Sequence, residues 1–182
     1  MQVLTFPIDS LLEFRPRIFG DDRGAFFESF SARTMAGLGL PHLDWVQDNQ
    51  SSSKAGTVRG LHFQRPPHAQ AKLVRVAQGR ALDVVVDLRR HSPTYGQHVT
   101  VELSAALGNV FFVPIGFAHG FVALEDDTLF LYKCTDYYAP AAEGGLCWND
   151  PALGIDWQLP SPALVSPKDA LLPTLAEFDT PF

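Results

Sequence analysis

The segment GNVFFVPIGFAHG, Gly108–Gly120, decides the fold expected for this chain. After its first glycine come five residues and Pro114, then one residue and Gly116, then two residues and His119. The run NVFFV is rich in apolar, β-branched and aromatic residues, which favour a strand, and proline with glycine favours a turn directly after it. The segment therefore predicts a strand, a turn and a second strand that carries a histidine.

This spacing resembles the second motif of the cupin barrels, and the segment Gly56–Gly79 resembles the first. Metal-binding cupins would have His, His and Glu where this chain has His62, Gln64 and Lys72. A lysine ammonium has no lone pair to give and repels a cation. We therefore expect an all-β, cupin-like double-stranded jelly-roll barrel with a few short helices, and neither a metal nor any other cofactor.

The residues that remain at these positions suit proton abstraction beside a carbonyl group. His62 can accept a proton near neutral pH, and Lys72 carries a positive charge. A base and a cation are what this chemistry needs, because the enolate that forms is negatively charged.

Length and composition fit one domain, residues 1–182, with a sizeable core. The chain is 46% hydrophobic and 19% charged, an ordinary soluble composition. No stretch approaches the run of about 20 apolar residues that a membrane helix needs, and we expect no signal peptide. Cys134 and Cys147 form no CxxC pair, which favours a reduced, cytoplasmic setting. The net charge of −6 argues against a nucleic-acid partner.

Short runs of β-branched and aromatic residues recur between turn signals, as in a sandwich or barrel. A helix is expected over Ser31–Leu38, where Ser31 can cap the start and Gly37 and Gly39 end it. The tail after Trp148 is expected to pack over the barrel. The strand candidates are Ala25–Phe30, Thr57–Phe63, Lys72–Ala77, Arg80–Leu88, His98–Leu103, Asn109–Val113, Gly120–Leu124 and Leu129–Thr135.

The alternation of Ala81–Leu88 leaves two interpretations open. Asp83, Val85 and Asp87 lie on one face of the expected strand, and only apolar residues lie on the other. If the acidic face lines the barrel, Asp83 can hold the ammonium of Lys72. If it faces outward, both carboxylates are simply in solvent.

Five longer segments of the chain carry recognisable motifs: Phe19–Phe30, Gln47–Gln97, Phe111–Leu124, Leu131–Trp157 and Ser166–Ala170. In order and over nearly the whole length, they resemble the dTDP-4-dehydrorhamnose 3,5-epimerase family. The family implies a cupin-like jelly roll, a homodimer and no metal. Its substrate is a dTDP-4-keto-6-deoxy sugar, dTDP-4-dehydro-6-deoxy-glucose, and its product feeds dTDP-L-rhamnose synthesis for cell-surface polysaccharide such as O-antigen.

The resemblance also implies roles for individual residues. His62 in RGLHFQ matches the catalytic base, Asp169 in SPKD the carboxylate paired with it, Tyr132 in FLYKCTDYY the general acid, and Lys72 in QAKLVR the residue at the ketone. Family dimers exchange N-terminal strands, so residues of FGDDRGAFFESF would reach into the partner's site. The matches to the substrate-binding set are Arg23, Glu28, Gln47, Asn49, Arg59, His119, Glu143 and Lys168.

Other functions on the same scaffold remain open at this point. A related enzyme of secondary metabolism would epimerise only C3 or only C5 of a similar dTDP-4-keto sugar. A metal-dependent cupin, such as a dioxygenase, is disfavoured by Gln64 and Lys72. A sugar-nucleotide binding protein without activity is disfavoured because base, acid and cation are all present.

Overall fold

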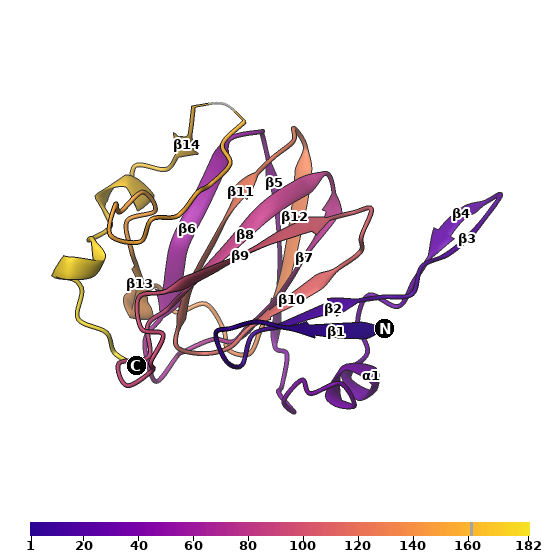
Figure 1. The fold of residues 1–182 in the computed structure, drawn as a ribbon, viewed down its shortest axis with the longest axis horizontal. Helices are drawn as coiled ribbons and strands as arrows, with labels where there is room; N and C mark the ends of the chain where they lie inside the picture. The colour runs from indigo at the N-terminus through magenta and orange to yellow at the C-terminus, as the bar shows by residue number, and fades with distance from the viewer. Residues whose placement is uncertain (161) are drawn as a thin grey trace.

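The computed structural model describes residues 1–160 and 162–182, and its two large sheets face each other as the halves of a flattened barrel (Figure 1). The first sheet is ordered β1-β2-β10-β7-β12-β5 and the second β13-β6-β11-β8-β9, all antiparallel. The bounds in the first sheet are Gln2–Thr5 (β1), Leu12–Arg15 (β2), Val110–Val113 (β10), Lys72–Gln78 (β7), Thr128–Cys134 (β12) and Gln47–Ser53 (β5). Those in the second are Glu143–Gly145 (β13), Thr57–Gln64 (β6), Phe117–Ala123 (β11), Arg80–Asp87 (β8) and His98–Ser104 (β9), with β14 (Leu164–Val165) added to β6 in parallel.

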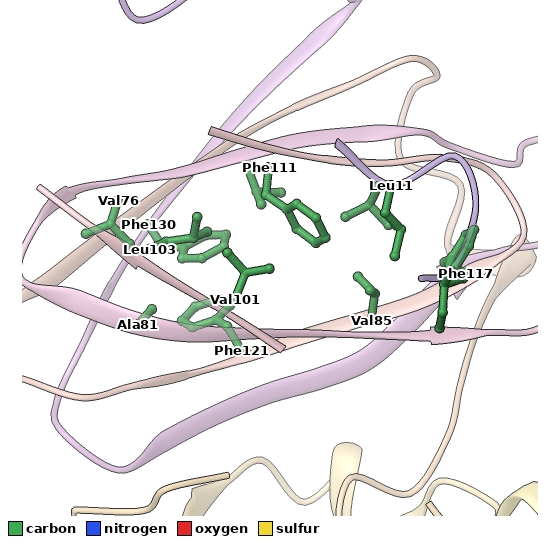
Figure 2. Packing of buried hydrophobic residues seen from close by; sticks show 13 residues of the cluster. Leu11, Val76, Ala81, Val85, Val101, Leu103, Phe111, Phe117, Phe121 and Phe130 are labelled. Atoms are coloured by element: carbon green, nitrogen blue, oxygen red, sulfur yellow. The ribbon is translucent and has the colours of Figure 1, made fainter. Parts of the chain in front are cut away.

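The space between the sheets is filled by apolar side chains from both walls (Figure 2). Phe111 and Phe130 come from the first sheet and Val85 and Phe121 from the second, and all four are buried. The rings of Phe121 and Phe130 stack across the barrel with centroids 3.9 Å apart. Burial of such side chains is the main stabilising term of the barrel, and the packed half leaves the rest of the interior for a cavity.

Further segments cover the outer faces of the barrel. The C-terminal tail packs on the second sheet, as expected, and its Phe178 and Phe182 contact the ring of Phe63 edge-on at 5.4 and 5.6 Å. On the first sheet lies α1 (Ala32–Ala36), whose Ser31 accepts a hydrogen bond from Thr34 N at 3.2 Å and so caps the helix as predicted. Short 3₁₀ helices follow at Pro140–Ala142 (η1), Asp169–Leu171 (η2) and Leu175–Glu177 (η3).

One element stands apart from the barrel. The hairpin formed by β3 (Phe19–Asp21) and β4 (Gly24–Phe26) projects from the body beyond β1 and β2 (Figure 1). Every residue of both strands is exposed. The expected strand Ala25–Phe30 therefore ends at Phe26, because the residues after it leave the hairpin and run back towards the barrel.

The predicted all-β barrel is confirmed, and most strand candidates lie within one or two residues of the observed bounds. The additions that the sequence pattern did not indicate are β1, β2, β3, β5, β13 and β14. Both faces of β8 are buried, and Asp83 is fully enclosed, which excludes the solvent-facing interpretation of that residue. Within residues 1–160 and 162–182, helices are too short and too polar to cross a membrane.

Candidate active site

Polar side chains from both sheets line a cavity at the end of the barrel that the core leaves open. It consists of two lobes of about 300 Å³ each, and His62, Lys72 and Tyr132 line both. The stacked rings of Phe121 and Phe130 form part of the first lobe. The first lobe also contains Arg59, His119, Lys168 and Asp169, and the second contains Gln47, Asn49 and Glu143. The structure thus brings together every predicted site residue except Arg23 and Glu28.

His62 on β6 is held by a carboxylate from the C-terminal tail. Its Nε2 lies 2.8 Å from Asp169 Oδ1, and Asp169 Oδ2 accepts a hydrogen bond from Gly60 N at 3.3 Å. The backbone N–H of Asp169 donates to Ser166 Oγ at 3.0 Å, which fixes the start of η2. Burial acts to raise the pKa of Asp169, but the hydrogen bond and charge of His62, together with the hydrogen bonds to Gly60 and Ser166, lower it overall. An ionised carboxylate therefore orients the ring and leaves Nδ1 free.

Lys72 and Tyr132 lie on the opposite sheet, on the paired strands β7 and β12. Tyr132 pairs with Val74 and Lys72 with Cys134, so the two side chains are diagonal neighbours on the inner face. Burial raises the pKa of Tyr132, so its hydroxyl stays protonated at neutral pH. Burial lowers the pKa of Lys72, while negative charge at Cys134, Asp83 and Glu143 acts the other way.

The rim of the cavity is held by a chain of charged contacts. Lys168 Nζ and the Tyr138 hydroxyl donate to the same oxygen of Glu143, at 2.6 and 2.7 Å. Burial acts to raise the pKa of Glu143, and these two hydrogen bonds lower it overall. Across the cavity, Gln47 Nε2 donates to Asn49 Oδ1 at 3.0 Å. Tyr138 is thus a rim residue, tied to the site by a contact that the sequence did not reveal.

Arg59 also points its charge at the cavity. Its Nε donates to Ser53 Oγ at 3.2 Å, across the two sheets, and a second guanidinium nitrogen faces the Ser52 carbonyl at 3.5 Å. The alternating residues Asn49, Ser51 and Ser53 of β5 therefore form a polar inner edge opposite Arg59.

Arg23 and Glu28 are not part of this cavity. Arg23 lies at the tip of the β3–β4 hairpin, and its guanidinium donates to Asp21 at 2.5 Å. Glu28 is exposed in the segment that follows the hairpin. A single chain therefore leaves these two predicted binding residues outside its own site.

His119 on β11 pairs in register with His62 on β6. Its Nε2 lies 2.8 Å from Asp83 Oδ2 on β8, so Asp83 is hydrogen-bonded to His119 and not to the ammonium of Lys72. Burial lowers the pKa of His119 and raises that of Asp83, and the attraction between the two partly offsets both shifts.

Two glycines allow β6 and β11 to approach closely beside these histidines. A Cβ on Gly60 would lie 2.5 Å from Gly120 Cα, and a Cβ on Gly120 would lie 2.7 Å from the Arg59 carbonyl oxygen. Gly60 also has φ near +136°, which residues with side chains rarely adopt. The register shifts just after His119, at this contact, so the glycines help to set His62 and His119 side by side.

The donor set of the cavity does not suit a metal ion. In the part of the chain that the structure describes, no three His, Cys, Asp or Glu side chains are grouped to hold one. Gln64, at a ligand position of metal-binding cupins, is committed to the backbone. Its Nε2 donates to the carbonyls of His68 and Tyr137 at 2.7 and 3.2 Å, and its Oε1 accepts from Ala139 N at 2.7 Å.

Comparison with known proteins gives a consistent picture. The family model for dTDP-4-dehydrorhamnose 3,5-epimerase matches residues 5–177. The enzymes of that name from Salmonella typhimurium and Pseudomonas aeruginosa are 49% and 47% identical, over 96% and 98% of both chains.

Solved structures are equally similar. A dTDP-6-deoxy-D-glucose-3,5-epimerase from Legionella pneumophila, in complex with dTDP-4-keto-L-rhamnose, has a TM-score of 0.93 and 45% identity, covering 98% of this chain and 94% of that one. A 3'-monoepimerase from Streptomyces bikiniensis, in complex with dTDP-quinovose, has a TM-score of 0.89 and 34% identity, covering 94% and 86%. These likenesses confirm the cupin-like fold.

Proposed function

The chain belongs to the dTDP-4-dehydrorhamnose 3,5-epimerase family, and we propose that it converts dTDP-4-dehydro-6-deoxy-D-glucose to dTDP-4-dehydro-L-rhamnose. The reaction inverts the two carbons that flank the C4 ketone. Each inversion removes a proton from carbon and returns one to the opposite face. It therefore needs a base on one side, an acid on the other and a positive charge at the ketone oxygen.

The observation that carries this proposal is the position of His62 and Tyr132 on opposite sheets, both lining the same cavity as Lys72. His62 Nε2 is engaged by Asp169, so Nδ1 is the nitrogen that takes the proton from carbon. The C–H electron pair moves into the enolate, and the Asp169 carboxylate stabilises the imidazolium that forms.

The opposite wall completes the reaction. Lys72 stabilises the negative charge that develops on the ketone oxygen, an interaction that strengthens only as the enolate forms and so lowers the barrier. The Tyr132 hydroxyl gives its proton to the far face of the same carbon. Solvent then protonates the phenolate and takes the proton from His62, which restores both groups for the next inversion.

The remaining cations suit the diphosphate of the substrate. Arg59 presents a planar guanidinium and Lys168 an ammonium beside the first lobe. Gln47, Asn49 and Glu143 line the second lobe and offer hydrogen bonds to the nucleotide-sugar. The overall charge of −6 makes such a local cluster necessary for an anionic substrate.

A second copy of the chain supplies Arg23 and Glu28. The hairpin that carries Arg23 projects away from the barrel and exposes Phe19 and Phe26. In a homodimer the hairpin of each protomer reaches the cavity of its partner, which explains why these residues are absent from their own site. The enzyme acts in the cytoplasm, needs no metal, and its product feeds dTDP-L-rhamnose synthesis.

An assay with a purified downstream 4-reductase tests the proposal. The reductase consumes NADPH only when the 4-keto sugar has been epimerised, so NADPH oxidation must depend on this protein. In D₂O, NMR of the product should show inversion and one solvent deuteron at both C3 and C5. A substrate that remains unchanged in stereochemistry and deuterium content contradicts the proposal.

The alternative is a 3-only or 5-only epimerase, and the likeness to the Streptomyces bikiniensis 3'-monoepimerase is what favours it. That likeness is at 34% identity, whereas the 3,5-epimerases of Salmonella typhimurium and Pseudomonas aeruginosa are at 47–49%. The same NMR experiment decides, because a monoepimerase inverts one carbon and leaves the other in its original configuration.

A further inference from the structure

Two His–Asp pairs lie side by side in the wall of the cavity, and only one has a part in the proposed reaction. His62 and His119 are paired residues on neighbouring antiparallel strands, so their Cα atoms are about 4.5–5.5 Å apart. His62 Nε2 contacts Asp169 and His119 Nε2 contacts Asp83, each at 2.8 Å. The second pair is as well formed as the first, and the mechanism above leaves it without a role.

Asp83 differs from Asp169 in the surroundings of its second carboxylate oxygen. Asp169 Oδ2 accepts a hydrogen bond from Gly60 N. Asp83 Oδ1 is buried and has no hydrogen-bond partner among the described residues, and the side chain is 0% exposed. Ser51 Oγ, which belongs to a residue that lines the same cavity, is the other such atom in residues 1–160 and 162–182. A buried carboxylate oxygen without a donor lowers stability, so its presence requires an explanation.

Packing does not explain a carboxylate at this position. The residues before and after Asp83 on the same face of β8, Ala81 and Val85, are apolar members of the core. Its neighbours in register are Val101 on β9 and Phe121 on β11, which are also buried and apolar. A valine would match these apolar neighbours, but it would leave the buried His119 Nε2 without the hydrogen bond that Asp83 makes to it.

The charges around Asp83 do explain it. His119 and His62 face the same corner from β11 and β6. Further titratable groups lie across the barrel on β7 and β12, and one lies in the same sheet on β13. These are Lys72, Tyr132, Cys134 and Glu143. Burial lowers the pKa of Lys72, and the Asp83 carboxylate is among the negative groups that raise it again. The Asp83 carboxylate therefore lies among titratable groups as well as apolar ones.

The same carboxylate selects one form of His119. Asp83 Oδ2 is an acceptor, so it requires a proton on His119 Nε2. Burial lowers the pKa of His119, which favours the neutral ring. In that ring Nδ1 is an acceptor, and it suits a sugar hydroxyl better than a phosphate oxygen.

Building on the proposed function, we infer that Asp83 is a positioning residue for the reaction, whose carboxylate fixes His119 in its Nε2–H tautomer and so presents His119 Nδ1 to the substrate as a hydrogen-bond acceptor.

The test compares Asp83→Asn with Asp87→Asn. Both carboxylates are fully buried on the same face of β8, but Asp87 lies outside the cavity and is bonded to Arg89, Ser92 and Thr94. Asp83→Asn should lower kcat roughly 10-fold, the order expected when one hydrogen bond to the substrate is lost, and leave Tm unchanged or higher. Asp87→Asn should lower Tm and leave the kcat of the folded enzyme unchanged.

The comparison of kcat values can contradict the inference without further measurements. A wild-type kcat in Asp83→Asn overturns it, because His119 would then serve the reaction equally well in either tautomer.

A second measurement needs no substrate. In free protein labelled with ¹⁵N-histidine, the His119 signals, assigned by their loss in His119→Gln, should show one tautomer protonated at Nε2. Asp83→Asn should give a mixture, because an amide can present either its oxygen or its NH₂. Unchanged signals overturn the inference. If the wild-type protein fails to epimerise the sugar, the proposed function fails, while the tautomer result still decides what Asp83 does to His119.

Discussion

The barrel and the β3–β4 hairpin differ in how deeply their charged residues are buried and in how those residues are held. In the barrel, His62 is held at 2.8 Å by Asp169 and only 29% of its side chain is exposed. On the hairpin, 89% of the Arg23 side chain is exposed and its partner Asp21 is only two residues away. The chain thus orders the groups of the proposed proton transfer within its own fold, whereas part of its proposed substrate-binding set lies on a hairpin with no core beneath it.

The β3–β4 hairpin has little to stabilise it within a single chain. Two-stranded hairpins are marginally stable in water unless they pack on something else. Phe26 is 73% exposed and Phe19 52%, an unusual amount of aromatic surface for so small an element. Contact with a second copy would bury both rings, so we expect the hairpin to gain its order from the dimer and the barrel to need no such help.

The severest test of the barrel is His62→Asn. Asparagine keeps polarity and much of the size of the ring but cannot take a proton, and general base catalysis is typically worth about 10²–10⁴ in rate. We expect epimerisation and deuterium exchange at C3 and C5 to fall together by at least ~10³-fold. His68→Asn is the control, because His68 is bonded to Asp136 at the surface. Near-normal exchange in His62→Asn would transfer the role of base to another residue, with His119 the first candidate.

Tyr132→Phe should divide the two halves of the reaction. The base and the ketone cation remain, so the enolate still forms and His62 returns a solvent deuteron to the original face. Inverted product should fall by about 10²–10⁴, while unreacted substrate gains deuterium in D₂O. Tyr95→Phe, at a partly exposed tyrosine away from the cavity, should change neither. An equal fall in exchange and inversion would mean that Tyr132 acts in enolate formation itself.

Lys72→Met should lower kcat about 10²–10³-fold, as the loss of one electrostatic donor to an oxyanion typically does. The effect on KM should be far smaller, because the charge at the ketone oxygen develops only after binding. Lys133→Met serves as the control, since Lys133 faces outward and is paired with Asp48. A rise in KM alone would make Lys72 a binding residue.

Arg23→Ala tests the proposed contribution of the β3–β4 hairpin to the substrate site of the partner protomer. It should raise KM while leaving the barrel folded. Assayed separately at limiting substrate, the Arg23→Ala and His62→Asn enzymes should each show reduced epimerase activity. When the two variants are mixed in equal amounts and exchange subunits, half of the dimers contain one copy of each. Each such dimer has one site with neither substitution, so about one quarter of all sites should regain wild-type activity. A monomer with full activity in sedimentation and assay would remove the role given to the hairpin.

The smallest effect is expected from removal of metal ions. Dialysis against a chelator should leave kcat unchanged, since Gln64 is bonded to the backbone and Lys72 is a cation. Metal analysis of the same sample provides the control. A large loss of activity that Zn²⁺, Mn²⁺ or Fe²⁺ restores would contradict a site built on base, acid and ammonium alone.

The sequence predicted the barrel well because its strands carry their own signals. β7, β8 and β12 are rich in β-branched or aromatic residues and were expected almost to their bounds. β5 is the exception. Its sequence QDNQSSS has no such residue, and it forms a strand through pairing with β12 and not through propensity. The strand that is hardest to predict is therefore the one whose polar edge lines the cavity.

The site shows the same limit. His62, Lys72 and Tyr132 could be placed because each lies within a recognisable strand motif. Alternation could not decide the orientation of Asp83, because both faces of β8 are buried and polarity does not distinguish them. The contact between His62 and Asp169 joins residues 107 apart in sequence, and nothing local fixes the course of the tail that brings it about.

Gly60 and Gly120 let the backbones of two strands pack closely, and this backbone contact fixes the distance between His62 and His119. Where side chains alone separate two functional groups, a slightly larger or smaller side chain can change the distance between them. Here a single added methyl group would meet backbone atoms at 2.5–2.7 Å, so it would displace whole strands and not just a neighbouring side chain. Substitutions that adapt the cavity to other substrates are therefore restricted to positions away from these two glycines. New keto sugars can be accommodated by altering the loops, the tail or the hairpin, while the paired histidines keep one fixed separation through all such changes.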